Sequence, residues 1–569
     1  MAKWVVGSAW PYVNAVPHLG NLVGSILSAD VFARFLRLMG EEVVAVSGSD
    51  EHGTPVEVEA RKRGLEPKEL TDKMHAYVSS LFKKYLISFD NYTRTHNPVH
   101  IKFVQDLFMK IYNNGYIFTQ DLILPYCPKD KIFLPDRFVT GTCPYCGYNG
   151  ARGDQCDACG KLLDPPDLIN PRCSLCGTRP TWKKTTHWFF DLPEAAKGLD
   201  EWVKESDLPD NVKNFTLKWL EEGLTPRAVT RDNKWGIPAP FPGAENKTIY
   251  VWFEAVLGYL SAVKELEVKE NREGLFEYFW KDLNTRTVYF IGKDNIPFHS
   301  IILPALLKAT GEQYPLPYHI SATEYLMYEG KKFSKSKRIG VWIDEALKLL
   351  PDPDYWRFAL IRMRPEDRDM NFVWKEFHRI INSELNDDIG NFAHRVLSFV
   401  KRRFGGKVEG EVDKEIKEKV EELHKKFVEA MYETRMRDAT NYLLEMARLG
   451  NKYLNEKEPW RMLKEGREEE AKSVMYTCMY ILREIAMHMA PFTPLAAQRL
   501  WEMLGEEGSV HEHGTLAREH GKDPKGVAVN PKPLFQKLPD EFADEQEMEK
   551  KIMKIREEVE KERPFPLFS

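Results

Sequence analysis

The chain has 569 residues, of which 43% are hydrophobic, 12% aromatic and 29% charged, as in a multidomain globular protein. This composition excludes a disordered chain, a collagen-like chain and a disulfide scaffold. The 81 basic and 86 acidic residues give a net charge of −5, which excludes a uniformly basic nucleic-acid coat protein but allows a local basic face. No run approaches the ~18 apolar residues of a membrane span, and residues 1–6 carry no basic leader, so we expect a cytoplasmic protein without membrane attachment.

The first 54 residues alternate between strand and helix patterns. Residues 3–9 form a short apolar run, residues 24–39 have apolar positions at helical spacing, and residues 42–46 are rich in β-branched side chains. Strand, loop, helix and strand begin a doubly wound α/β domain, in which ligands bind beyond the carboxyl ends of the strands. The sequence therefore predicts a ligand crevice at residues 9–21 and 47–54.

Seven of the eight cysteines lie in residues 127–176, a segment rich in glycine, proline and aspartate. Three C-x-x-C pairs occur there, and such pairs supply two corners of a zinc tetrahedron. Two pairs complete one four-sulfur site, and the remaining three cysteines need a fourth ligand. Asp130 has the C-x-x-C spacing from Cys127, whereas His187 is the alternative fourth ligand. We therefore predict two structural Zn²⁺ ions, against the alternative of redox-active or incidental cysteines. The predicted ligands are Cys143, Cys146, Cys156 and Cys159 for the first site, and Cys127, Asp130, Cys173 and Cys176 for the second.

The alternation of strand and helix resumes after the cysteine-rich insertion. Residues 248–253 and 287–291 read as buried strands that complete the sheet, and helical patterns follow from about residue 371. The predicted fold is α/β, a Rossmann-type doubly wound parallel sheet split by a zinc-knuckle insertion and followed by an α-helical bundle. The expected divisions are 1–116 and 220–325 for the two sheet halves, 117–219 for the insertion, 326–385 for a connecting segment, 386–530 for the bundle and 531–569 for a tail with one helix.

Further segments carry polar groups suited to chemistry at this crevice. Residues 10–21 read W-P-Y-V-N-A-V-P-H-L-G-N, in which a glycine at a helix start allows close approach to a phosphate. Residues 329–338 place five basic side chains in ten positions and predict a polyphosphate clamp. Residues 252–259 and 292–299 put aromatic and polar groups after predicted strands, where a small substrate binds. Each segment alone also fits a plain role, as a helix-start histidine, a solvated basic loop or core aromatics.

In combination and order, these segments resemble the class I aminoacyl-tRNA synthetases. The two class signatures correspond to His18-Leu19-Gly20-Asn21 and Lys332-Phe333-Ser334-Lys335-Ser336, with Asn21 in place of histidine and Phe333 in place of methionine. Within the class, residues 11–14, 50–54 and 133–139 and the pair Pro459-Trp460 resemble the methionyl-tRNA synthetase family of archaeal type. The alternative from another class is a zinc-bearing nucleic-acid-binding protein on a nucleotide-binding scaffold, without acyl transfer.

The resemblance implies ATP-dependent ligation of L-methionine to initiator and elongator methionine tRNA through methionyl-adenylate, with Mg²⁺ accompanying ATP. It implies that His18 and Asn21 hold the triphosphate and that Lys332 and Lys335 stabilise the leaving pyrophosphate. Recognition of the CAU anticodon is implied for Arg395 and Trp460, and a monomer is expected. The implied substrate-binding residues, with Asp50 on the methionine α-ammonium, are Trp10, Tyr12, Asp50, Trp252, Ala255, Tyr259, Asp294, His299 and Ser334.

Overall fold

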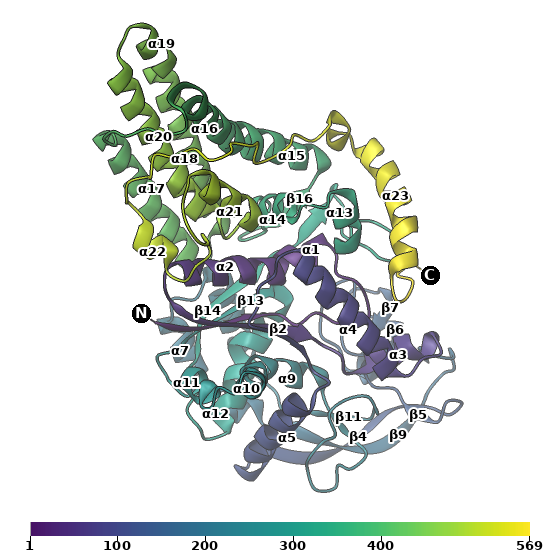
Figure 1. Ribbon diagram of the computed structural model, residues 1–569. Coiled ribbons are helices and arrows are strands. Elements are labelled where there is room, and N and C mark those ends of the chain that lie inside the picture. Colours follow the sequence, from purple (N-terminus) through teal and green to yellow (C-terminus); the bar gives the residue numbers. More distant parts are fainter. Residues whose placement is uncertain (1, 569) are drawn as a thin grey trace.

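The computed structural model describes residues 2–568 and places a parallel sheet below a helical bundle (Figure 1). The sheet has the strand order β14-β13-β1-β2-β3, and every neighbouring pair is parallel, so the predicted doubly wound α/β fold is confirmed. In register, Val5 lies between Thr287 and Val44. The strands are β1 (Lys3–Ser8), β2 (Glu42–Ser49), β3 (Asn91–Arg94), β13 (Arg286–Gly292) and β14 (Pro317–Thr323).

The alternation of side chains along the strands divides the core into two layers. Trp4 and Val6 pack in one layer with α2 (Leu27–Leu38), whereas Val5 packs in the other layer. Successive side chains of a strand point to opposite faces, so both faces of this sheet are covered, as parallel sheets require. The second layer contains α5 (Pro98–Asn113), α10 (Gly258–Lys269) and α12 (Leu303–Ala309).

Strand β1 lies between β2 and β13, and this arrangement positions the site. The strand order runs outward from β1 in both directions, so the connections after β1 and β13 leave in opposite directions at the carboxyl ends, the place where ligands bind in such sheets. Residues 9–21 leave β1 at this edge, and residues 293–299 leave β13 there. The predicted crevice therefore lies at the topological switch point of the sheet.

The prediction that residues 248–253 form a strand of this sheet is wrong. Only Thr248–Ile249 form a strand, β12, and it pairs antiparallel with β11 (Thr230–Arg231) outside the sheet. Residues 251–255 form the helix α9 (Val251–Ala255), which leads into α10. A short apolar run fits a buried helix as well as a buried strand, and here its continuation through Leu257 and Leu260 packs against the second sheet face. The second strand of this half of the sheet is β14, which pairs with β13.

The insertion consists of a long antiparallel ribbon and a small three-stranded sheet. Strands β4 (Ile117–Cys127) and β9 (Thr181–Phe190) form the ribbon, and β6 (Val139–Thr142), β7 (Asn149–Arg152) and β8 (Ile169–Cys173) form the small sheet. Its separate hydrophobic cluster has only eleven buried members, and four of them are cysteines. So small a core favours stabilisation by metal, as in other small metal-binding modules.

The C-terminal part is helical as predicted. Within the bundle, α17 buries Ile416, Val420 and Phe427, which fall on the predicted apolar face. A final helix, α23, descends beside α13 towards the N-terminal half (Figure 1). The main helices are α13 (Ile343–Leu349), α14 (Pro353–Arg362), α16 (Asn391–Phe404), α17 (Lys414–Tyr432), α18 (Met436–Lys457), α19 (Pro459–Lys464), α20 (Glu468–Met489), α21 (Pro494–Met503) and α23 (Glu545–Glu562).

Helical residues 19–38 meet the length and hydropathy expected of a membrane span, although the sequence contains no long uninterrupted apolar run. The 18-residue window that meets these criteria is 72% buried inside the protein, as in the core helix of a globular domain.

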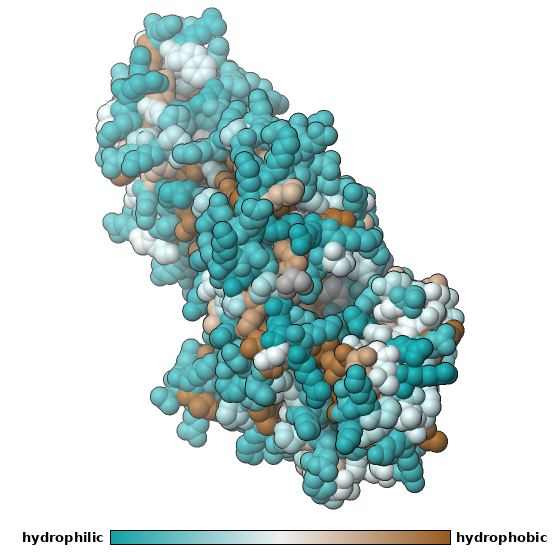
Figure 2. Space-filling view, turned by 90° about the vertical axis from the view of Figure 1, so that its right-hand side faces the viewer, coloured by the Kyte–Doolittle hydropathy of each residue, from teal (hydrophilic) through white to brown (hydrophobic). Residues whose placement is uncertain are grey.

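The face in Figure 2 is mostly hydrophilic, and its hydrophobic side chains are dispersed.

Candidate active site and zinc knuckles

The first signature begins a helix through a reciprocal cap. The Nδ1 atom of His18 accepts a hydrogen bond from the backbone N–H of Asn21 at 3.2 Å, and Oδ1 of Asn21 accepts from the backbone N–H of His18 at 3.0 Å. Burial lowers the pKa of His18 to about 3, so the ring is neutral and Nε2 carries its proton. Both side chains thus keep an N–H donor for an anion, Nε2 in His18 and the amide NH₂ in Asn21.

The second signature lies directly on the first. The ring of Phe333 stacks on His18 with centroids 4.2 Å apart and planes 13° apart. Ser334 and Ile339 exchange two backbone hydrogen bonds of 2.9 Å, which close the loop and leave Lys332 and Lys335 exposed. The substitution of phenylalanine for methionine in this signature therefore retains the apolar contact and adds a ring stack.

The C-terminal tail holds the end of this loop, a contact that the sequence did not reveal. Arg556 donates to the backbone oxygens of Arg338 at 3.2 Å and Gly340 at 2.9 Å, and its Nε lies 2.8 Å from Glu345. The ring of Phe568 meets Trp342 edge-on, with centroids 5.0 Å apart. No local pattern in residues 545–568 indicates these partners, because they are more than 200 positions away.

Aromatic side chains from separate elements contact one another in two groups. Trp252 donates from Nε1 to the hydroxyl of Tyr12, and its ring meets Phe298 edge-on at 5.0 Å. The Tyr259 hydroxyl lies 2.8 Å from Nε2 of His299, and Nδ1 of His299 lies 2.8 Å from the carbonyl oxygen of Asn295. A carbonyl only accepts, so Nδ1 of His299 carries the proton and Nε2 accepts from Tyr259.

Trp10 and Ala255 lie in the same region. A Cβ on Gly48 or Gly258 would approach the Trp10 ring to 2.5 Å, so both glycines are needed for the ring to pack there. Ala255 is half-buried at the end of α9. Of the predicted substrate-binding residues, Tyr12 is therefore hydrogen-bonded to Trp252 and Tyr259 to His299, whereas Trp10 packs against Gly48 and Gly258.

Asp50 is a buried carboxylate with one unpartnered oxygen atom. Only 3% of its surface is exposed, and Oδ1 has no hydrogen-bond partner among residues 2–568. Backbone hydrogen bonds from Asp50 N–H to Pro11 (2.8 Å) and from Val13 N–H to Asp50 (3.3 Å) fix it beside residues 11–13. Burial, followed by the charges of Glu254 and Glu51, raises the pKa of Asp50 well above its usual value. A bound cation would stabilise the ionised form of such a buried carboxylate.

Asp294 and Lys332 both lie near the side chain of Tyr325. The Tyr325 hydroxyl donates to Oδ2 of Asp294 at 2.7 Å, and Nζ of Lys332 lies 5.9 Å from the centroid of the Tyr325 ring. Asp294 is exposed at the carboxyl end of β13. A polar group from the sheet edge and a cation from the second signature therefore face the same region.

In the bundle, Arg395 and Trp460 lie on different helices. Arg395 on α16 donates to Asn455 of α18 at 2.7 Å. Trp460 on α19 has 38% of its surface exposed, so it is not a fully packed interhelical side chain. No contact joins the two residues in the described chain.

Four turns of one kind hold the cysteines. In each turn, the N–H of the fifth residue donates to the carbonyl oxygen of the first, at 2.8 Å for Lys131, 3.0 Å for Gly147, 2.8 Å for Gly160 and 2.9 Å for Gly177. These residues have positive φ angles of 56°, 75°, 73° and 71°, which glycine adopts most readily. The turn after Cys127 is therefore a fourth knuckle, in which the carboxylate of Asp130 occupies the place of the second cysteine.

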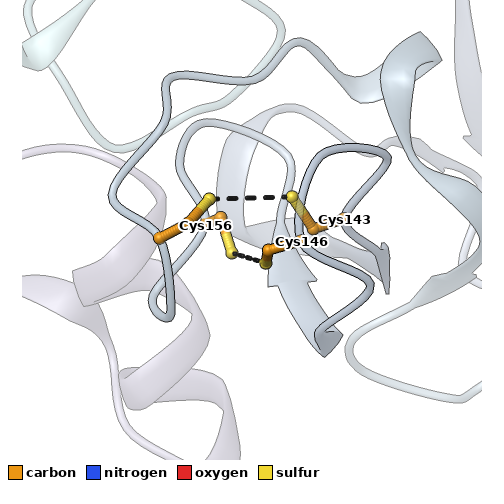
Figure 3. Close-up of side chains that lie close together, drawn as sticks. Cys143, Cys146 and Cys156 are labelled. Atoms are coloured by element: carbon orange, nitrogen blue, oxygen red, sulfur yellow. Dashed lines mark hydrogen bonds between the residues drawn. The ribbon is translucent and has the colours of Figure 1, made fainter.

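The first ligand set has the dimensions of a zinc site (Figure 3). Sulfur atoms lie 3.9 Å apart in Cys143 and Cys159 and 3.6 Å apart in Cys146 and Cys156, far beyond a disulfide bond. Zn–S bonds of about 2.3 Å place tetrahedral sulfurs about 3.8 Å apart. This four-cysteine cluster can therefore bind zinc.

The second ligand set is also assembled. Cys127 and Cys176 have sulfurs 3.5 Å apart, and Oδ2 of Asp130 lies 3.5 Å from the sulfur of Cys127 and 3.3 Å from that of Cys173. His187, the alternative ligand, is instead bonded to Thr230 at 2.8 Å and to Asp232 at 2.7 Å.

A doubly wound sheet whose crevice carries these two signatures, followed by a helical bundle, defines a class I aminoacyl-tRNA synthetase. The family described as tRNA synthetases class I (M) matches residues 4–397, and the anticodon binding domain of methionyl tRNA ligase matches residues 404–556. The chain belongs to the methionyl-tRNA synthetase family.

Curated relatives extend over the whole chain. The methionine--tRNA ligase of Ignicoccus hospitalis is 74% identical over 565 residues, which are 99% of this chain and 100% of the relative. That of Aeropyrum pernix is 57% identical over 551 residues, which are 96% of each chain. A solved structure, Mycobacterium tuberculosis methionyl-tRNA synthetase in complex with methionyl-adenylate, is 24% identical, has a TM-score of 0.77 and covers 94% of this chain and 100% of its own. This structure has the same fold.

Proposed function

We propose that this protein ligates L-methionine to methionine tRNA in two steps, with ATP and through a methionyl-adenylate intermediate. The observation that carries the proposal is the contact between the two signatures, in which the ring of Phe333 stacks on His18. The buried Asp50 carboxylate, whose Oδ1 has no hydrogen-bond partner among residues 2–568, supports it. The family assignment and the 74% identical methionine--tRNA ligase support it.

Methionine-dependent exchange of labelled pyrophosphate into ATP tests the first step. We expect exchange with methionine and far less with leucine, because the assigned residues combine aromatic faces with two tyrosine hydroxyls, which suits a polarizable thioether. A nucleic-acid-binding protein without acyl transfer would give no exchange with any amino acid, and that result would reject the proposed function.

Within this reaction, we assign the roles from the chemistry of each group. Asp50 pairs with the α-ammonium of methionine, and Tyr12, Trp252, Tyr259 and His299 surround the thioether. The α-carboxylate attacks the α-phosphate in line, so catalysis consists mostly of positioning and charge stabilisation.

The phosphate groups require donors and cations. His18 and Asn21 donate to the triphosphate, whereas Lys332 and Lys335, with Ser334 between them, approach the leaving pyrophosphate. We assign Asp294 to a contact with the ribose or the adenylate. Mg²⁺ accompanying ATP would neutralise part of the phosphate charge. His18 is neutral because burial lowers its pKa, so it would bind the triphosphate as a hydrogen-bond donor and not as a cation.

We further propose that Arg395 and Trp460 read the CAU anticodon, by an edge hydrogen bond and by stacking, respectively. Trp460→Ala is expected to weaken tRNA charging by about 1–3 kcal/mol of lost stacking, while exchange without tRNA is unchanged. Trp460→Phe is the matched control, because it retains an aromatic face and most of the charging. If exchange falls as far as charging does, Trp460 is a packing residue instead.

We propose two structural zinc ions, one in the four-cysteine cluster and one held by Cys127, Asp130, Cys173 and Cys176. The repeated knuckle turn and the short sulfur–oxygen distances support the second ion. With all four positions occupied by protein ligands, neither ion has an open position for catalysis, so both stabilise the insertion. We also propose that the protein acts in the cytoplasm, where charged tRNA serves translation. We further propose that it is a monomer.

Metal analysis tests the second ion. The purified protein is expected to contain two zinc ions per chain, and Asp130→Ala is expected to contain one and to unfold at a lower temperature. Asp130→Cys completes the fourth C-x-x-C pair and is expected to retain both ions, as is the control Asp157→Ala in the same insertion. One zinc per wild-type chain would refute the second site.

A further inference from the structure

A chain of buried ionisable groups leads from α9 to the surface, and the reaction steps above leave it unused. Glu254 is fully buried, and its Oε1 lies 2.7 Å from Nδ1 of His52, which is also fully buried. Nε2 of His52 lies 3.0 Å from Nδ1 of the half-buried His96. The three side chains form a continuous hydrogen-bonded path along which a proton can move.

Two buried carboxylates near this path lack a cation, Glu254 at its inner end and Asp50 two residues before His52 in the chain. Oδ1 of Asp50 and Oε2 of Glu254 have no hydrogen-bond partner in the described chain. Across residues 2–568, neither group forms an ion pair with lysine or arginine. Burial and then the charge of Glu51 raise the pKa of Glu254 well above its usual value. Burial, followed by the charges of Glu254 and Glu51, does the same for the pKa of Asp50.

The other ionisable groups around this pair are already engaged. The guanidinium of Arg94 lies 2.6 Å from Glu51 and 2.5 Å from Asp72, so its charge is matched by those carboxylates. Nδ1 of His100 is bonded to Ser261 at 2.7 Å, and the Tyr12 hydroxyl accepts from Trp252. Burial lowers the pKa values of His52 and His96 to about 4, so neither ring supplies a permanent positive charge.

Two neighbouring buried carboxylates cannot both ionise at low cost, and one proton between them removes the repulsion. We propose that the empty site keeps one proton on Asp50 and Glu254, and that binding of the methionine α-ammonium expels this proton to solvent through His52 and His96. The proton leaves as the ammonium charge enters, so the buried charge is conserved, and no bond within methionine changes. This inference rests on the proposed function, and in it Glu254 is a positioning residue that acts through Asp50.

Calorimetric titration of methionine into the full-length protein, at pH 7 in buffers of different ionisation enthalpy, counts the released protons. The slope of observed enthalpy against buffer ionisation enthalpy is expected to be on the order of one proton per methionine bound. Since binding releases a proton, methionine affinity is expected to rise between pH 6 and pH 7.5, by up to about tenfold per pH unit. Wild-type protein that binds methionine without releasing a proton would overturn the proposal.

Glu254→Gln keeps the size of the side chain but removes the carboxylate that begins the path, and with it one of the charges that raise the pKa of Asp50. Proton release is expected to fall below that of the wild type while methionine still binds. Glu57→Gln is the matched control, because Glu57 is a buried carboxylate that already accepts from the backbone N–H groups of Lys234 at 3.3 Å and Trp235 at 3.2 Å. This control is expected to release the same number of protons per methionine bound as the wild type.

Equal release from Glu254→Gln and wild type would also overturn the proposal. If Glu254→Gln does not fold, the wild-type slope and the pH dependence of affinity decide the question. The proposed function fails separately, when neither methionine binding nor pyrophosphate exchange is observed, and this inference then fails with it.

Discussion

Lys335→Ala is expected to lower the rate of pyrophosphate exchange by about 10²–10³ while methionine affinity stays close to that of the wild type. The reason is that negative charge grows on the leaving pyrophosphate in the transition state, where an exposed lysine of the second signature can meet it. Free methionine binds in the aromatic pocket and does not need this cation. Exchange kinetics and methionine calorimetry on the same preparation measure both quantities.

A surface lysine provides the control for this experiment. Lys375→Ala removes an equally exposed cation from α15 (Trp374–Arg379), outside both signatures, and is expected to leave exchange unchanged. Unchanged exchange in Lys335→Ala would remove Lys335 from the mechanism. A parallel loss of methionine affinity would instead indicate that the substitution disturbs the pocket.

Asp50→Asn is expected to weaken methionine binding by about 2–5 kcal/mol, because the α-ammonium loses its buried counter-ion. The empty protein is expected to become more stable, on the order of 1 kcal/mol near neutral pH, since an amide is easier to bury than an unpaired carboxylate. The pKa of Asp50 is raised by folding, so its unfavourable contribution grows as pH rises above the unfolded-state pKa of about 3.9. Below about pH 4 the two proteins are expected to be equally stable.

Asp30→Asn is the contrasting variant, because Asp30 is a buried carboxylate with partners. It lies 2.9 Å from Arg34 and 2.8 Å from Arg357, so its loss leaves buried charge uncompensated and is expected to cost about 3–5 kcal/mol of stability. Thermal unfolding and methionine calorimetry distinguish the two variants. A destabilised Asp50→Asn protein that binds methionine normally would contradict the assignment of Asp50.

Local patterns in the sequence were sufficient for the features whose geometry is local. The C-x-x-C spacing predicted the knuckles because one tight turn positions both thiolates, and the spacing of Asp130 from Cys127 predicted the fourth turn. The alternation of strands and helices predicted the doubly wound sheet, and the signature at residues 18–21 predicted a helix start beyond β1. The knuckles and the helix start join groups within a few residues of one another, and the sheet follows from the order of local strand and helix patterns.

The tertiary structure decided what depends on distant partners. Residues 248–253 are apolar enough for a strand, and only packing against the sheet made residues 251–255 a helix. The hydrogen bonds from Arg556 to the signature loop join segments more than 200 residues apart. The path from Glu254 through His52 to His96 joins segments 202 and 44 residues apart. Such contacts leave no periodic trace in a single sequence, because each group is placed by the fold of another segment and not by its own neighbours.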